Sequence, residues 1–298
     1  MRSLIFSLLA ACGPGVYQLD TPSRFEACVA ASCPMAIGGT VYVQATLATD
    51  VEELVPLQAV SVEPPSLAAV ELHDDYFLVR PASAGTGTLR ATLRDGRLME
   101  RRLRVAAVAA TAIVVPELPD GTSDFALLAG STLGVYAEHR DAAGDLLLGD
   151  GLDAWRATGG TVVEDRRADP AFEDDLGRAI IATDPAQLVI SAGPGSTLAV
   201  DVAPLGSTRE LVLVEQATNH IALGANELRA VEVRAFDPQH RLLIGGAPLT
   251  LEVADPTLVT ATPHGRSISL EGRHAVGDTE VIVHFDGSTL RVMVTVHR

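Results

Sequence analysis

The chain has 298 residues, of which 47% are hydrophobic and 20% charged, a balance typical of folded domains rather than of a disordered chain. The formal net charge is −16, and all 22 basic residues are arginine. An acidic surface repels phosphate backbones, so we expect no nucleic-acid partner. The absence of lysine excludes a phosphate-loop lysine, a Schiff base and a Ser–Lys dyad.

The N-terminus has the pattern of an export signal. Arg2 precedes an apolar stretch, residues 4–11, which is too short to span a bilayer because that takes about 20 residues. The small residues Ala10 and Ala11 stand directly before Cys12. A Gly-Pro-Gly run follows, which is suited to a tether.

Leu9-Ala10-Ala11-Cys12 resembles the lipobox of bacterial lipoproteins. The resemblance implies that residues 1–11 are a signal peptide and that the Cys12 thiol carries the lipid that holds the protein on a membrane. A Gly directly after the lipidated Cys implies the outer membrane in a host that has two membranes. The alternative is an ordinary secretory signal or a buried first strand, in which Cys12 has no special role.

The two remaining cysteines, Cys28 and Cys33, form an even pair in a chain predicted to be exported to an oxidising compartment. Residues 23–26 have the pattern of a capping box, which predicts a short helix to about Ala31, and Pro34 stops that helix. We therefore expect a local disulfide. The alternative is two reduced thiols, because a zinc site would need more ligands than this pair offers.

From about residue 35 onward, apolar and polar residues alternate with a period of two, which predicts half-buried antiparallel strands. Three such strands contain Val43, Val135 and Val233, which are 92 and 98 residues apart. A sandwich domain has about 100 residues, so the spacing predicts one domain per repeat. The first and last copies both reach an Asp-Gly hairpin turn, at residues 95–96 and 286–287.

The first and last copies also share longer segments: residues 62–67 match 253–258, and residues 85–93 match 277–285. Together these segments resemble bacterial immunoglobulin-like domains. The resemblance implies an all-β chain of tandem antiparallel immunoglobulin-like β-sandwiches behind the short helix and the lipidated tether. The middle copy departs from the pattern with an insert at residues 162–177. The alternative is generic antiparallel structure with shifted borders.

The predicted organisation has a signal, a tether and three domains. The segments are a lipoprotein signal peptide at 1–11, a tether with a short helix and the cysteine pair at 12–34, and immunoglobulin-like domains at 35–108, 109–205 (divergent, with the insert) and 206–298.

Several acids cluster in the middle copy and offer the oxygen ligands that Ca²⁺ takes. Their spacing is not that of an EF-hand, and Asp and Gly are also the usual residues of a hairpin turn, so we prefer a turn to a calcium site. The third copy has Asp237 in the same place without the other acids. The four candidates are Asp141, Asp145, Asp150 and Asp153.

The eight histidines are dispersed, and neither His-Glu-x-x-His nor Gly-x-Ser-x-Gly occurs. We therefore expect no enzyme, no cofactor and no metal. Arg102 and Arg104 share one face of a predicted strand and are interpreted as a charged sheet edge. The leading hypothesis is a non-enzymatic envelope lipoprotein that acts as a spacer or as an adhesion or interaction module. Its lipid would contact the membrane, and its partner would be another envelope protein or a polysaccharide. The alternative is a calcium-assisted or carbohydrate-binding module that uses the middle-domain loops.

Overall fold

The computed structural model describes residues 16–20, 33–48, 53–74, 76–116, 118–119, 122–163, 178–183, 187–193, 195–214, 216, 218–246 and 248–298. Every regular element in these ranges is a β-strand, so the predicted all-β fold is confirmed. The helix predicted from the capping box lies outside the described residues. Within them, no helix is long and apolar enough to cross a membrane.

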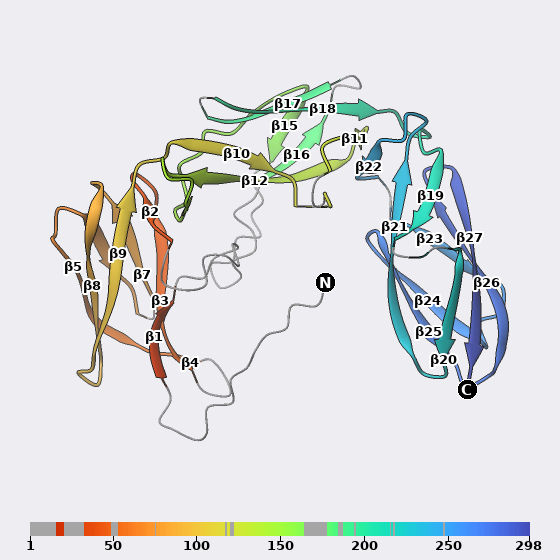
Figure 1. Cartoon of the computed structure of the whole chain (residues 1–298), viewed down its shortest axis with the longest axis horizontal. Helices are drawn as coiled ribbons and strands as arrows, with labels where there is room; N and C mark the ends of the chain where they lie inside the picture. The colour runs from red at the N-terminus through yellow and green to blue at the C-terminus, as the bar shows by residue number, and fades with distance from the viewer. Residues whose placement is uncertain are drawn as a thin grey trace. The chain divides into compact units, whose positions relative to one another are not determined.

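The first sandwich consists of two sheets, antiparallel except for the pair β2 and β9, and is drawn in red to yellow in Figure 1. Its strands are β1 (Val16–Asp20), β2 (Met35–Ala36), β3 (Val41–Ala48), β4 (Glu53–Leu54), β5 (Leu57–Glu63), β6 (Ala68–Leu72), β7 (Tyr76–Pro81), β8 (Gly85–Leu93) and β9 (Leu98–Ala106). One sheet has the order β1-β3-β7-β6 with β4 on β3, and the other has the order β2-β9-β8-β5. Alternate side chains such as Val43, Phe77 and Leu89 fill the core between them.

The second sandwich contains the divergent copy. Its strands are β10 (Ala110–Val114), β11 (Phe125–Leu128), β12 (Thr132–Arg140), β13 (Leu146–Leu147), β14 (Arg156–Thr158), β15 (Gly160–Val163), β16 (Arg178–Ala182), β17 (Gln187–Gly193) and β18 (Ser196–Ala203). The strand orders are β10-β12-β16-β15 and β14-β17-β18-β11. Most of the predicted insert, residues 164–177, lies outside the described residues.

The third sandwich follows, drawn in teal to blue in Figure 1. Its strands are β19 (Glu210–Leu213), β20 (His220–Gly224), β21 (Leu228–Phe236), β22 (Leu242–Ile244), β23 (Thr250–Val253), β24 (Val259–His264), β25 (Ser267–Gly272), β26 (Gly277–Phe285) and β27 (Ser288–His297). One sheet contains β22-β21-β25-β24 with β19 on β21, and the other has the order β20-β27-β26-β23.

All three sandwiches have the same connectivity. Lettered in chain order, each places strands A, B, E and D in one sheet and C, F and G in the other, which is the arrangement of immunoglobulin constant domains. Each also has a short strand before B that pairs in parallel with the last strand: β2 with β9, β11 with β18, and β20 with β27. We call β2, β11 and β20 the entry strands. The predicted immunoglobulin-like sandwiches are therefore confirmed.

The described residues divide into two compact units. The residues up to Ala112 together with Glu138–Asp153 form the first unit, and the remainder form the second. The border between the two units falls within β12, so part of the second sandwich belongs to the first unit. The predicted domain borders at residues 108 and 205 stay predictions. One strand was not expected, because β1 lies in the predicted tether and pairs antiparallel with β3.

Candidate functional site

Two segments that follow the second long strand of a sandwich share one sequence pattern. Residues 141–149 and 237–245 both read Asp, four variable residues, Leu-Leu, then Leu or Ile, then Gly. We call them the joint segments, because each one runs from its own sandwich onto the entry strand of the preceding sandwich. The sequence singles out Asp141 and Asp237 as turn residues. The feature that could have revealed the joint is the Leu-Leu-x-Gly that follows both of them.

Each joint segment begins with a turn built around its aspartate. Asp141 Oδ1 accepts hydrogen bonds from the backbone N–H groups of Ala143 and Asp145, both at 2.9 Å. The third sandwich repeats the arrangement, since Asp237 Oδ1 accepts from the two equivalent backbone N–H groups at 2.9 Å. Both aspartates are buried, 8% and 3% exposed. The turn preferred from the sequence is present in both sandwiches.

The second carboxylate oxygen of each turn pairs with an arginine. Asp141 Oδ2 accepts from Arg104, which also lies 2.7 Å from Asp145. Asp237 Oδ2 accepts from Arg241 Nε at 2.8 Å. Arg104, which the sequence pattern predicts on a charged sheet edge, pairs with the Asp141 turn.

The last strand of the preceding sandwich supplies a charge at both joints. Arg104 lies on β9 and reaches the Asp141 turn, whereas Asp201 lies on β18 and pairs with Arg241. Arg104 and Asp201 have opposite charges but equivalent positions, because each stands two residues before the residue that accepts the N–H of the turn after the entry strand. An ion pair therefore connects each joint segment to the sandwich before it.

The hydrogen bonds also change how these carboxyl groups titrate. Burial raises the pKa of Asp237, but the backbone N–H and the guanidinium of Arg241 outweigh it and hold the pKa below its usual range. The pKa of Asp141 is lowered in the same way: burial opposes the shift, while two backbone N–H groups and Arg104 favour the charged form.

At the first joint, the segment adds backbone hydrogen bonds and an apolar side chain to the first sandwich. Ala36 N–H of β2 donates to Leu148 O at 2.7 Å, and Thr40 and Asp150 exchange two backbone hydrogen bonds of 3.0 and 2.8 Å. Leu148 is part of the first core. All of these residues belong to the first unit.

At the second joint, the segment becomes strand β22 and pairs in parallel with β11. Phe125 and Leu127 of β11 point into the second core, whereas Ala126 and Leu128 point into the third. One sheet of the second sandwich and one of the third therefore form a single nine-stranded sheet with the order β14-β17-β18-β11-β22-β21-β25-β24 and with β19 on β21. This sheet lies within the second unit.

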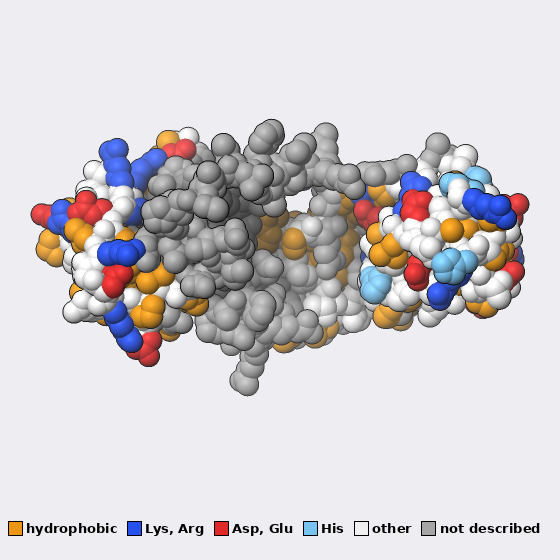
Figure 2. Space-filling model, turned by 90° about the horizontal axis from the view of Figure 1, so that it is seen from below, with side chains coloured by type: hydrophobic (Ala, Val, Ile, Leu, Met, Phe, Trp, Pro, Cys, Tyr) orange, Lys and Arg blue, Asp and Glu red, His pale blue; other side chains and the backbone are white. Residues whose placement is uncertain are grey.

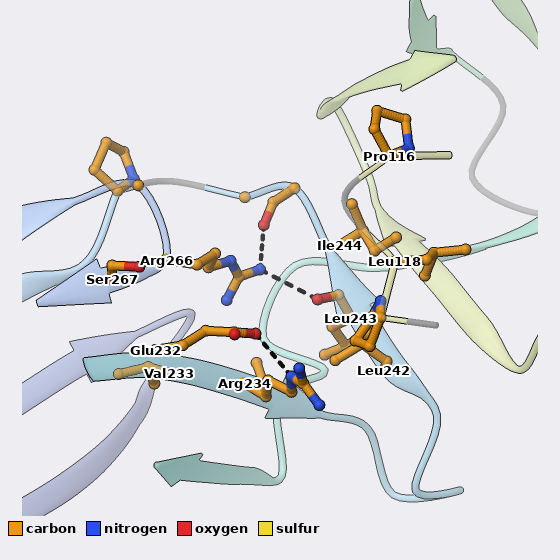
Figure 3. A pocket seen from close by; sticks show the side chains of 16 residues that line it. Pro116, Leu118, Glu232, Val233, Arg234, Leu242, Leu243, Ile244, Arg266 and Ser267 are labelled. Atoms are coloured by element: carbon orange, nitrogen blue, oxygen red, sulfur yellow. Dashed lines mark hydrogen bonds and ion pairs between the residues drawn. The ribbon is translucent and has the colours of Figure 1, made fainter. Parts of the chain in front are cut away.

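A cavity of about 650 Å³ lies beside β22 (Figure 3). Arg266 Nη2 donates to the carbonyls of Leu243 and Gly245, and its guanidinium lies 3.7 Å from the centre of the Phe285 ring. Arg234 pairs with Glu232 at 2.7 Å. The described residues that line the cavity include no histidine, cysteine or aspartate. Its charged groups pair with one another, with backbone carbonyls or with the Phe285 ring.

The four acids considered for calcium do not converge. Asp141 and Asp145 both face Arg104, and Asp153 Oδ1 lies 3.1 Å from His139 Nε2. In the described part of the chain, no group of three or more His, Cys, Asp or Glu side chains is placed to hold a metal ion. The acids concerned are Asp141, Asp145, Asp150 and Asp153.

The predicted cysteine sites fall largely outside the described residues. Cys12 and Cys28 are not among them, and Cys33 packs half-buried against the first core. Lipidation of Cys12 and the Cys28–Cys33 disulfide therefore stay predictions. On the face in Figure 2, acidic and basic side chains are interspersed on the described surface.

No family model and no curated protein matches the chain. Solved structures match weakly. An Escherichia coli adhesin, FdeC, is 14% identical with a TM-score of 0.28 over 97% of this chain and all of that one. Domains 5–6 of the S-layer protein SbsC are 15% identical, with a TM-score of 0.32 over 64% and 98%. An endo-fucoidan hydrolase of glycoside hydrolase family 107 is 14% identical, with a TM-score of 0.25 over 96% and 44%.

Proposed function

We propose that the chain is a non-enzymatic protein of the cell envelope, a lipid-anchored spacer that presents an interaction surface. The observation that carries this proposal is the joint segment. Both joint segments combine a turn fixed by a buried aspartate, an ion pair and apolar residues that pair with the entry strand of the preceding sandwich. Such joints suit a protein that holds a surface in position.

The membrane contact in this proposal is the lipid on Cys12. The support is the sequence Leu9-Ala10-Ala11-Cys12 after a short apolar run. More than one acyl chain on the Cys would hold the protein firmly, since a single chain gives only reversible binding. The proposed location is the outer membrane, and the proposed partner is another envelope protein or a polysaccharide.

Cys12→Ser tests the anchor. Without the thiol no lipid can be attached, so we expect the variant to move from the membrane fraction to the soluble fraction of fractionated cells. Cys33→Ser is the matched control, because it removes a cysteine but leaves the lipobox intact, and it should stay in the membrane fraction. A Cys12→Ser protein that remains with the membranes would contradict the anchor.

The soluble Cys12→Ser chain is also the probe for the partner. On a glycan array and in crosslinking to isolated envelopes, we expect capture of one class of ligand and no turnover of it. Hydrolysis of any arrayed glycan would overturn the non-enzymatic proposal. The calcium-assisted alternative lacks support, because Asp141 and Asp145 already pair with Arg104.

A further inference from the structure

The turn after the entry strand is built in the same way in all three sandwiches, which makes single positions comparable. Its first N–H donates to the last strand: Ile37 to Ala106 O at 3.0 Å, Ala129 to Ala203 O at 2.8 Å, and Ala225 to His297 O at 3.0 Å. The next residue has a positive φ each time, at Gly38, Gly130 and Asn226.

The residue after that we call the gate position, and it is Gly39, Ser131 or Glu227. Its N–H donates to the carbonyl three residues earlier in each sandwich, at 3.2, 3.0 and 3.1 Å. The three gate residues are therefore equivalent by hydrogen bonding, although their side chains differ greatly in size.

At the first two sandwiches, the gate residue is small and touches the glycine of the arriving joint segment. A Cβ on Gly39 would lie 3.1 Å from Gly149 Cα. Ser131 Oγ accepts from Gly246 N–H at 2.7 Å, and a Cβ on Gly245 would lie only 2.3 Å from Ser131 Cβ. A large gate side chain would therefore collide with the joint segment.

At the third sandwich, the gate residue closes the edge of β20. Glu227 Oε2 accepts from Gly224 N–H at 2.6 Å. The equivalent N–H in the first sandwich, that of Ala36, instead donates to Leu148 O of the joint segment at 2.7 Å. The carboxylate thus occupies the place of a partner strand's carbonyl. Among the described strands, β20 pairs with β27 alone (Figure 1).

We propose that the outer edge of β20 is an acceptor for the joint segment of another immunoglobulin-like repeat, and that Glu227 holds it closed. The occupant is a segment of the Asp-x4-Leu-Leu-x-Gly type in parallel pairing, because this segment pairs in parallel with both other entry strands, as strand β22 on β11 and as a single bridge between Leu148 and Met35. An exposed strand edge invites unwanted pairing, and a charge on the edge is a known protection. Glu227 protects this edge by taking its N–H and by filling the space of the incoming glycine.

The surface beside β20 retains features of the other joints. Thr295 stands on β27 where Arg104 and Asp201 stand on the earlier last strands, and it donates to Asp278 Oδ1 at 2.5 Å. The Asp278 carboxylate offers a partner for an arginine placed like Arg241. The joint segment of the third sandwich, which carries this arginine, is therefore the better probe.

The test measures binding of a fluorescent peptide with the sequence of residues 237–246 to the full chain carrying Cys12→Ser. Glu227→Ser reproduces Ser131 and opens the edge, whereas Glu227→Gln keeps both the size and an acceptor oxygen. By fluorescence polarisation, we expect Glu227→Ser to bind at least about tenfold more tightly than Glu227→Gln or the chain with Glu227, about 1.4 kcal/mol.

Hydrogen exchange gives a second measurement on the same variants. Without peptide, the Gly224 amide should exchange faster in Glu227→Ser than in Glu227→Gln, and peptide should restore its protection. If Glu227→Ser binds no better than Glu227→Gln, or if the chain with Glu227 binds equally well, the proposal is wrong. Glu227→Gly, which reproduces Gly39, replaces the serine variant if the latter does not fold.

Discussion

Asp237 shows how much of a joint depends on one side chain. Its carboxylate is almost fully buried, yet both oxygens are used, one for two backbone N–H groups and one for Arg241. A buried carboxylate is stable in the charged form only with such partners. Asp141 has the same role, although its arginine comes from the preceding sandwich.

The lowered pKa of Asp237 makes the stability of the third sandwich depend on pH. The unfolded chain has the ordinary aspartate pKa of about 3.9, which lies above the folded value, so the stabilisation is present above that pH. It is lost as the pH falls through the folded pKa, when the carboxylate is protonated. Asp237→Asn keeps one acceptor oxygen but loses the charge.

We expect Asp237→Asn to lose about 1–3 kcal/mol at pH 7, from the weakened bond to Arg241. Its free energy of unfolding should then fall less than that of the unmodified chain between pH 6 and pH 3. Urea unfolding across this range measures both quantities. Asp74→Asn is the control, because its side chain is 99% exposed. Parallel pH profiles for Asp237→Asn and the unmodified chain would contradict the role of this charge.

At the scale of elements, β11 is the least usual strand because it has no solvent face. All four of its residues are buried, and they alternate between the second core and the third. The short strand β22 does the same with Leu242 and Ile244 on one side and Leu243 on the other. Truncating a side chain on one face of such a strand removes packing from one core directly, so local opening should begin in that core.

Leu128→Ala and Leu127→Ala form a matched pair on β11, since both leucines are 0% exposed. Each should cost about 2–5 kcal/mol through the cavity left behind. Leu128→Ala should speed hydrogen exchange first in the third core, at residues such as Val283. Leu127→Ala should do so in the second core, at Ile190. The same exchange pattern for both variants would contradict the division of the strand between two cores.

Much of this architecture is predictable from the sequence. Period-two alternation and the Asp-Gly turns predict strands and hairpins, because each depends on neighbouring residues only. The joints are harder, because parallel pairing of β22 with β11 connects residues more than 100 positions apart. The run at Leu242–Ile244 is apolar on every residue, and only burial on both faces explains it. Strand β1 was missed since a five-residue segment beside Gly and Pro has little local signal.

At the scale of the second unit, the two cores share one sheet and should unfold together. The nine-stranded sheet leaves no break in hydrogen bonding between the second and third sandwiches, and Ala126 and Leu128 of the former belong to the core of the latter. Loss of the third sandwich would expose these residues and the edge of β11 to water. We therefore expect coincident transitions in this unit.

Trp155, the only tryptophan, reports on the second sandwich, since it packs against the second core. Leu270 is 1% exposed in the third core, and Leu270→Ala should cost about 2–5 kcal/mol. Because the sheet is shared, the Trp155 fluorescence transition should move to lower urea concentration in this variant. Leu228→Ala, at a side chain 70% exposed, should leave the transition in place. A Trp155 transition that is unchanged in Leu270→Ala, while hydrogen exchange in the third core rises, would mean that β11 holds the sandwiches together without coupling their unfolding.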